Sequence, residues 1–277
     1  METHSPQRSP FPRNGLDSYF FTTPALRLRM DLIQEYVRRG GTPVLILGEP
    51  GAGKSTLLNQ LVCRADHNWR AVRIPAVASF SADDVVTFLN AELRLSTRMS
   101  ADEMLREFDR WLERLSVRGQ VAVIVVDNAH DLDDEALTRL ATLRDDVGTK
   151  NVCILMTGEP GLRSRLNALI GPAAASGAVP TVSVPCLDKR EVASYIDMRL
   201  YHAGMEGRGP FNRSTIDDIA RTSRGHPGQI NAMANDVLNG VRGGDRLKRA
   251  QRHIRHFMGQ WLTAGLVSTS GEPRTDR

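Results

Sequence analysis

The residues with the plainest chemical role form a glycine-rich stretch near the start of the chain. They fit the pattern G-x-x-x-x-G-K-[ST] and are Gly48, Glu49, Pro50, Gly51, Ala52, Gly53, Lys54, Ser55 and Thr56. The glycines of this pattern let backbone N–H groups turn toward phosphate oxygens, and the following helix N-terminus adds positive partial charge. Lys54 is expected to reach the β- and γ-phosphates, and the Ser55 hydroxyl to bind Mg²⁺. The stretch therefore predicts a site for ATP and Mg²⁺.

An acidic residue at the end of a buried strand would complete the metal site. The apolar run 121–126 precedes Asp127, which we therefore expect to be the second protein ligand of Mg²⁺. Asn128 follows, at the place where many P-loop ATPases carry a glutamate that polarises the attacking water. An amide can orient water, but it does not accept a proton at physiological pH. The two residues predict ATP binding and leave hydrolysis open.

Two further polar residues lie near the ends of predicted strands. Thr157 follows the run 151–156, where its hydroxyl could lie beside the γ-phosphate, although a turn residue is an equally good interpretation. His130 could be a catalytic base, but a helix-start residue that contacts backbone or Asp131 is the simpler interpretation. The candidate catalytic residues are therefore Lys54, Asp127, Asn128 and Thr157.

The scaffold for these residues is predicted from apolar runs that alternate with helical patterns. Strands are expected at residues 44–47, 71–74, 121–126, 152–156 and 179–184, and helices at 54–64, 81–95, 100–115, 133–145 and 162–169. A further helix begins after the N-cap Thr23 and ends at Gly40. Continuous apolar strands alternating with helices are typical of a parallel sheet covered on both faces. We expect an α/β fold with a five-stranded parallel sheet of P-loop type, flanked by helices.

The predicted strands end before residue 188, and helical patterns follow. Asp188 and Glu191 have the spacing of a capping box, and two more helices are expected at 214–222 and 227–238. The first residues are rich in proline, serine and arginine, which bury too little surface to become ordered. The predicted domains are a flexible arm at 1–22, the P-loop α/β nucleotide-binding domain at 23–187, a small helical lid at 188–241 and a basic C-terminal tail at 242–277.

Positive charge is concentrated in that tail. The 36 Lys and Arg residues exceed the 32 Asp and Glu residues, which gives a formal charge of +4. Residues 242–277 hold eight basic and three acidic residues, so the tail has a net charge of +5 and the remainder of −1. Attraction to nucleic acid or anionic lipid would therefore depend mostly on the tail.

Several protein classes are excluded by composition. The first residues lack the apolar core of a secretory signal, and no run of about 18 apolar residues could span a membrane. Cys63, Cys153 and Cys186 form neither a zinc pattern nor a disulfide framework. We interpret them as small buried hydrophobic residues of a cytoplasmic protein.

Several segments taken together resemble the AAA-type ATPase domain of the ExeA-like and DamX-like bacterial proteins. They are the glycine-rich stretch at 48–56, the residues 127–130, 157–162 and 199–204, and the Gly-His-Pro-Gly-Gln-Ile-Asn segment at 225–231. The resemblance extends from about residue 20 to residue 240. It implies that Asp127 is the Walker B acid, that Thr157 lies near the sensor 1 position, and that residues 188–241 are a lid.

Two positions depart from that family. ExeA-like proteins usually have an arginine after the proline of the lid motif, reaching the γ-phosphate, where this chain has Gly228. The stretch 168–184 has no arginine for an arginine finger, and we interpret the nearby Arg163 and Arg165 as solvated helix charges. The resemblance implies a partner protein in secretion, cell-envelope or division machinery, and it allows a homo-oligomer.

Three functions are compatible with these residues. The favoured one is an AAA-type ATPase module that couples nucleotide state to a partner protein and hydrolyses ATP with Mg²⁺, at a low rate because Asn128 replaces the usual glutamate. The second is an ATP-binding switch without hydrolysis, in which bound ATP orders the lid. The third is a DNA adaptor of the transposition-regulator type. The basic tail supports it, but no helix-turn-helix signal does, and aromatic residues for base stacking make up only 5% of the chain.

Overall fold

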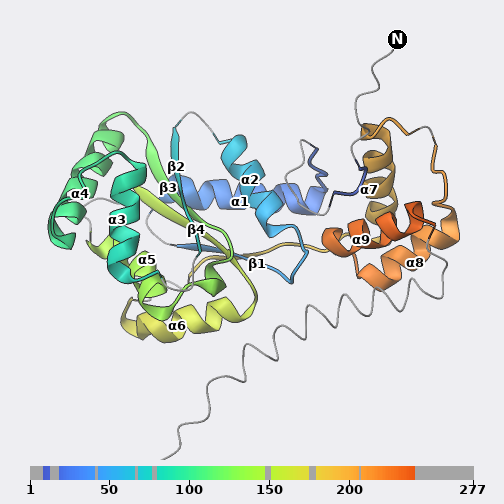
Figure 1. Cartoon of the computed structure of the whole chain (residues 1–277). Helices are drawn as coiled ribbons and strands as arrows, with labels where there is room; N and C mark the ends of the chain where they lie inside the picture. Colours follow the sequence, from blue (N-terminus) through green and yellow to red (C-terminus); the bar gives the residue numbers. More distant parts are fainter. Residues whose placement is uncertain are drawn as a thin grey trace, which may run out of the picture. The chain divides into compact units, whose positions relative to one another are not determined.

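Two compact units divide the chain, one comprising residues 14–186 and the other residues 1–13 together with 187–277. The computed structural model describes residues 9–12, 19–40, 43–65, 68–76, 80–146, 151–174, 179–205 and 207–240. The first unit is α/β, and the second contains helices α7, α8 and α9 (Figure 1).

The α/β unit is built on five parallel strands, as predicted. They are β1 (Val44–Leu47), β2 (Trp69–Ile74), β3 (Val121–Val126), β4 (Val152–Gly158) and β5 (Thr181–Ser183). Their order in the sheet is β2-β3-β4-β1-β5, so β4 lies between β1 and β3. β1 and β3 lead into the glycine-rich stretch and Asp127, and Thr157 lies near the carboxyl end of β4. The predicted fold class is confirmed.

The helices of this unit lie close to the predicted ranges. They are α1 (Pro24–Arg39), α2 (Lys54–Cys63), α3 (Ala82–Glu92), α4 (Ala101–Val117), α5 (Asp134–Asp146) and α6 (Gly161–Ala174), with a short 3₁₀ turn, η1 (Ala129–Asp131), after β3. The Ser81 hydroxyl accepts a hydrogen bond from the Asp84 N–H, and the Asp84 carboxylate accepts one from the Ser81 N–H. Ser100 and Glu103 form the same reciprocal pair at α4. Because these caps satisfy backbone donors that the helix leaves unpaired, the starts of α3 and α4 can be read from the sequence.

The sheet is buried on both faces, which explains its continuous apolar strands. Along β3, Ile124 and Val126 belong to one hydrophobic cluster, whereas Val123 and Val125 belong to another. The first cluster includes residues of α3, α4, α5 and α6, and the second includes residues of α1 and α2. Alternate side chains of a strand point to opposite faces, so both sets are apolar when helices cover both faces.

The helical unit consists of α7 (Lys189–His202), α8 (Arg213–Ser223) and α9 (Pro227–Leu238). The predicted capping box at Asp188 and Glu191 is present. Gly225, between α8 and α9, has a φ of 77°, and a Cβ there would lie 2.0 Å from the Leu187 carbonyl oxygen. Only glycine allows both this backbone conformation and this close approach. The Gly-His-Pro segment therefore has a packing role in the start of α9.

Residues 9–12 differ from the flexible arm that composition predicts, because they pack within the helical unit. Phe11 is fully buried, and its ring centroid lies 5.7 Å from that of Phe211. The Asn235 side-chain amide donates a hydrogen bond to the Phe11 carbonyl, and the Asn231 amide donates one to the Pro12 carbonyl at 3.4 Å. Composition is an average over the whole segment, so it does not show that one aromatic side chain is buried by helices much later in the chain.

Three smaller expectations have different outcomes. Cys153 is buried as expected, but Cys63 and Cys186 are exposed, so the interpretation of all three as buried residues is wrong. Within the described residues, no helix has both the length and the apolar composition needed to cross a bilayer. The predicted basic tail at 242–277 lies outside the described residues.

Candidate functional site

The glycine-rich stretch forms a tight loop between β1 and α2, as its pattern predicts. The Gly48 N–H donates to the Gly158 carbonyl of β4 at 3.2 Å, which joins the start of the loop to the neighbouring strand. Gly51 and Gly53 have φ values of 79° and 92°, in the left-handed region that favours glycine. A Cβ at Gly48 would lie 3.1 Å from the Ala52 Cβ, so the loop curls back on itself.

The remaining loop residues lie where the pattern requires them. Glu49 accepts the Ala52 N–H at its carbonyl (3.1 Å), and Pro50 follows at the turn. Lys54, Ser55 and Thr56 form the first turn of α2, whose backbone N–H groups are the donors that a phosphate site uses.

Lys54 is buried and lies against the loop that precedes it. Its Nζ donates to the Gly48 carbonyl at 2.8 Å and to the Glu49 carbonyl at 3.1 Å. Burial lowers the pKa of Lys54, and the negative charges of Glu159, Asp127 and Glu49 oppose that shift. Three carboxylates are therefore near enough to favour the charged form of Lys54, and two of them follow β3 and β4.

Thr157 joins the ends of β3 and β4 through its side chain. The register pairs Val126 with Met156, so the next residues, Asp127 and Thr157, lie side by side. The buried Thr157 hydroxyl donates to the Asp127 carboxylate and accepts the Asn128 N–H at 2.9 Å. Thr157 is therefore more than a turn residue, because it orients the carboxylate expected to bind metal.

Asn128 has a backbone role that its position beside Asp127 did not predict. Its φ of 56° and ψ of 44° are left-handed, a conformation that Asn tolerates better than most residues. Its side chain is exposed. The structure thus gives a reason for Asn at this turn that is independent of catalysis.

Arg165 of α6 binds the turn after β3 and is not a solvated charge. Its guanidinium donates to the carbonyl of His130 at 3.0 Å and to that of Leu132 at 2.7 Å, and to the Asp134 carboxylate at 2.8 Å. These bonds hold η1 and the start of α5 in place. The interpretation of Arg165 as a solvated helix charge is wrong, and its sequence position offered no signal for these contacts.

Glu159 belongs to the segment 157–162 that carries the family resemblance, but it was not predicted to be a site residue. It follows β4 directly, and its side chain is 15% exposed. One carboxylate oxygen lies 3.7 Å from the His130 Nε2, which also lies 3.7 Å from the Asp131 carboxylate. The His130 Nδ1 is buried without a hydrogen-bond partner. His130 is thus a turn residue between two carboxylates, in agreement with its simpler interpretation.

The donor set of the site matches the chemistry of Mg²⁺. A hydroxyl at Ser55 and a carboxylate at Asp127 are hard oxygen ligands, and Mg²⁺ in nucleotide sites takes few protein ligands besides phosphate and water. Among the described residues, no group of three or more His, Cys, Asp or Glu side chains could hold a metal.

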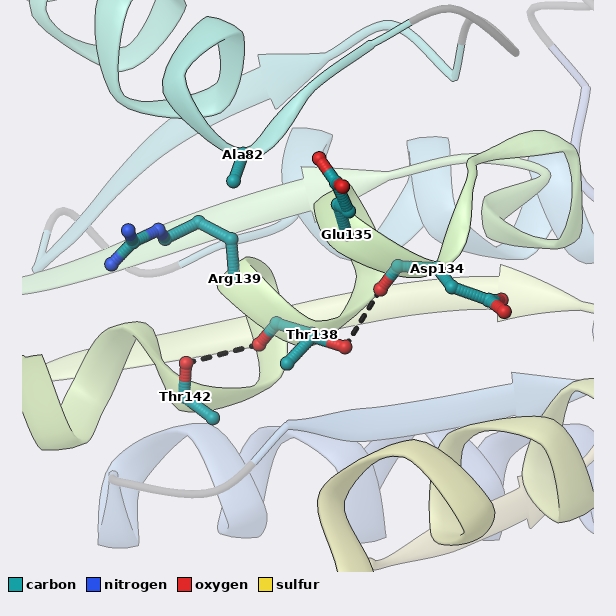
Figure 2. Close-up of a pocket in the computed structure, with 6 residues that line it drawn as sticks. All are labelled: Ala82, Asp134, Glu135, Thr138, Arg139 and Thr142. Atoms are coloured by element: carbon teal, nitrogen blue, oxygen red, sulfur yellow. Dashed lines mark hydrogen bonds between the residues drawn. The ribbon is translucent and has the colours of Figure 1, made fainter.

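A separate hollow of about 460 Å³ lies along α5 (Figure 2). Its lining residues are Ala82, Asp134, Glu135, Thr138, Arg139 and Thr142. The Thr138 hydroxyl donates to the Asp134 carbonyl at 2.7 Å, and the Thr142 hydroxyl to the Thr138 carbonyl at 3.0 Å. Since both hydroxyls are satisfied within the helix and no loop residue lines the hollow, the phosphate loop remains the candidate site.

Comparison with known proteins identifies the same part of the chain. Residues 37–166 match the family model described as AAA domain. This segment contains the glycine-rich stretch, Asp127 and Thr157, and its match to the AAA domain of P-loop ATPases implies ATP binding. A comparison with curated proteins found no match.

Solved structures share the fold at low sequence identity. A Walker-type ATPase of Pyrococcus abyssi is 15% identical with a TM-score of 0.63, over 88% of this chain and 75% of that one. The Cdc6p protein of Pyrobaculum aerophilum is 16% identical with a TM-score of 0.60, over 86% and 70%. The ORC1 protein of Aeropyrum pernix, solved in complex with DNA, is 14% identical with a TM-score of 0.56, over 87% and 68%. At these identities the likeness shows the fold alone.

Proposed function

We propose that the chain is an AAA-type ATPase module that binds ATP with Mg²⁺, hydrolyses it at a low rate, and couples its nucleotide state to a partner protein in the cytoplasm. The observation that carries this proposal is the pair of Lys54 on the curled phosphate loop and Asp127 oriented by Thr157. Lys54 and Asp127 follow the carboxyl ends of β1 and β3, the two strands that flank β4, and open α/β sheets bind ligands at this edge.

Each of these residues has a defined task in this proposal. The loop N–H groups and the start of α2 bind phosphate oxygens, and Lys54 exchanges the loop carbonyls for the phosphates. Bound Mg²⁺ neutralises phosphate charge in such sites. Ser55 and Asp127 hold that ion, while Thr157 keeps the Asp127 carboxylate in a single orientation.

The resemblance to ExeA-like and DamX-like proteins supports a protein partner in secretion, envelope or division machinery. Neither the arginine expected in the lid nor an arginine finger is identified, since Gly228 stands at the lid position and Arg165 is bonded to the turn after β3. Oligomerisation in the presence of ATP would let a neighbouring copy supply an arginine.

The test measures ATP affinity and phosphate release together, for the unaltered protein and for Lys54→Ala. Loss of a charged donor to phosphate costs about 1.5–3 kcal/mol, so affinity is expected to fall about 10- to 150-fold. Phosphate release is expected to fall to background. Equal release by both proteins would refute the proposed hydrolysis.

A second candidate function is an ATP-binding switch, which the exposed amide of Asn128 favours because it cannot accept a proton. Tight ATP binding with no phosphate release above that of Lys54→Ala would support the switch. A DNA adaptor is a third candidate, supported by the basic tail. Deletion of residues 242–277 with unchanged DNA affinity would remove that support.

A further inference from the structure

The end of β4 brings an additional carboxylate to the edge of the phosphate loop. The sheet register pairs Leu47 with Gly158, and the Gly48 N–H donates to the Gly158 carbonyl at 3.2 Å. Glu159 is therefore the next residue after a strand end that is bonded directly to the loop. It is also two residues after Thr157, which contacts Asp127 and Asn128.

The backbone around Glu159 is held in a tight turn. Its carbonyl accepts the Leu162 N–H at 3.0 Å. A Cβ at Gly158 would lie 2.4 Å from the Leu162 Cδ2, so the turn packs closely on the start of α6. The position of the Glu159 backbone is thus determined by packing and not by a long flexible loop.

The Glu159 side chain is largely shielded from solvent. Its 15% exposure contrasts with 55% for Asp131, the other carboxylate that contacts His130. The carboxylate therefore lies beside the turn that follows Asp127, directly after the strand end that is bonded to the phosphate loop.

His130 places a second constraint on this carboxylate. Its Nε2 lies 3.7 Å from the Glu159 carboxylate, and Arg165 binds the His130 carbonyl at 3.0 Å. Through the Arg165 bonds, α6 holds the η1 turn, and this turn contains His130, the neighbour of Glu159.

Hydrolysis of ATP needs an acceptor for the proton of the attacking water, and Asn128 is not one. We propose that Glu159 is this acceptor, the catalytic carboxylate that the position after Asp127 lacks. The proposal rests on the proposed ATPase function.

The reaction then balances as follows. The water oxygen forms a bond to the γ-phosphorus, and the bond from the γ-phosphorus to the β,γ-bridging oxygen breaks. One water proton passes to the Glu159 carboxylate, and the bridging oxygen leaves as part of ADP. Inorganic phosphate forms, and the proton on Glu159 is released to solvent, so the carboxylate is regenerated.

A different role for Glu159 predicts a different result. If its charge only keeps Lys54 protonated, then Glu159→Gln should weaken ATP affinity as Lys54→Ala does. If it accepts the proton of water, Glu159→Gln should leave ATP affinity nearly unchanged and slow the chemical step alone. Affinity and turnover, measured separately, therefore distinguish the two roles.

The experiment measures affinity for a fluorescent ATP analogue with Mg²⁺, and single-turnover phosphate release, in the full chain. Glu159→Gln is expected to reduce release about 100-fold or more, the range for loss of a general base, with affinity within about twofold. Asp131→Asn is the matched control, because it removes the more exposed carboxylate beside His130, and its release rate should be unchanged.

The double variant Asn128→Glu/Glu159→Gln places a new carboxylate at the neighbouring strand end. This double variant is expected to recover part of the lost release, which a purely structural defect would not allow. Unchanged release in Glu159→Gln would overturn the proposal, as would a parallel loss of affinity and release. If the unaltered protein releases phosphate no faster than Lys54→Ala does, the ATPase function itself is refuted.

Discussion

Two buried cations show how differently the two units of this protein are built. Lys54 donates to carbonyls of residues only five and six positions away in the chain. Arg199 of α7 donates to the Tyr195 hydroxyl at 3.1 Å, and its guanidinium lies over the Tyr195 ring. Tyr195 in turn donates to Asn231 of α9, which binds the carbonyl of Pro12, 219 residues away in the sequence.

The phosphate loop is therefore a local structure, whereas the helical unit depends on contacts between the two ends of the described chain. Local contacts are encoded in a short motif, so the loop has a recognisable sequence pattern. Contacts across more than 200 residues have no such pattern, although they decide whether the helical unit has a complete core. The following variants test this difference, from the largest expected effect to the smallest.

Phe11→Ala should destabilise the helical unit by about 3–5 kcal/mol, because it removes a fully buried aromatic ring and leaves a cavity beside Phe211. Hydrogen exchange should become faster in α8 and α9 but not in α2, and ATP affinity should persist. Leu28→Ala, at a side chain that is 61% exposed, is the control. If α9 is equally protected from hydrogen exchange in both variants, the helical unit does not need residues 9–12.

Thr157→Val should damage the phosphate site without affecting the helical unit. In this variant a methyl group of similar shape replaces the hydroxyl that donates to the Asp127 carboxylate. Loss of such a hydrogen bond to a charged group costs about 1.5–3 kcal/mol. Phosphate release should fall about 10- to 100-fold if this energy is realised in the transition state. The comparison variant is Thr138→Val, whose hydroxyl bonds within α5 and whose loss should leave release unchanged.

Asn128→Ala should cost about 1–2 kcal/mol of stability in the α/β unit, because alanine is disfavoured in the left-handed conformation. Asn128→Gly should avoid that cost, since glycine adopts positive φ readily. Chemical denaturation of both variants measures the difference. If the two are equally stable, the backbone of this turn does not account for Asn128.

Asn235→Ala should have the smallest effect, about 0.5–1.5 kcal/mol, because it removes the hydrogen bond to the Phe11 carbonyl and the exposed one from the Ser9 hydroxyl. The effect should be nearly absent when Phe11→Ala is already present, because the two residues act through the same segment. A double-mutant cycle followed by hydrogen exchange of α9 measures this coupling. Additive effects would separate the Asn235 bond from the packing of Phe11.

Much of the α/β unit could be predicted from the sequence because its signals are short-range. The run 121–126 is strand β3, and the helices expected at 81–95 and 100–115 are present as α3 and α4. The site was predicted less completely. Lys54, Asp127 and Thr157 were found from their motif or their place after a strand, but Glu159 and Arg165 were not assigned the contacts that they make.

The sequence by itself determined the phosphate loop, the alternation of strands and helices, and the helix caps, because each depends on residues a few positions apart. Only the tertiary structure decided which strand ends meet, and so placed the Thr157 hydroxyl on Asp127 and the Glu159 carboxylate beside His130. It also decided that Phe11 is buried against Phe211. These contacts follow from strand order and side-chain packing, which local propensity and composition do not specify.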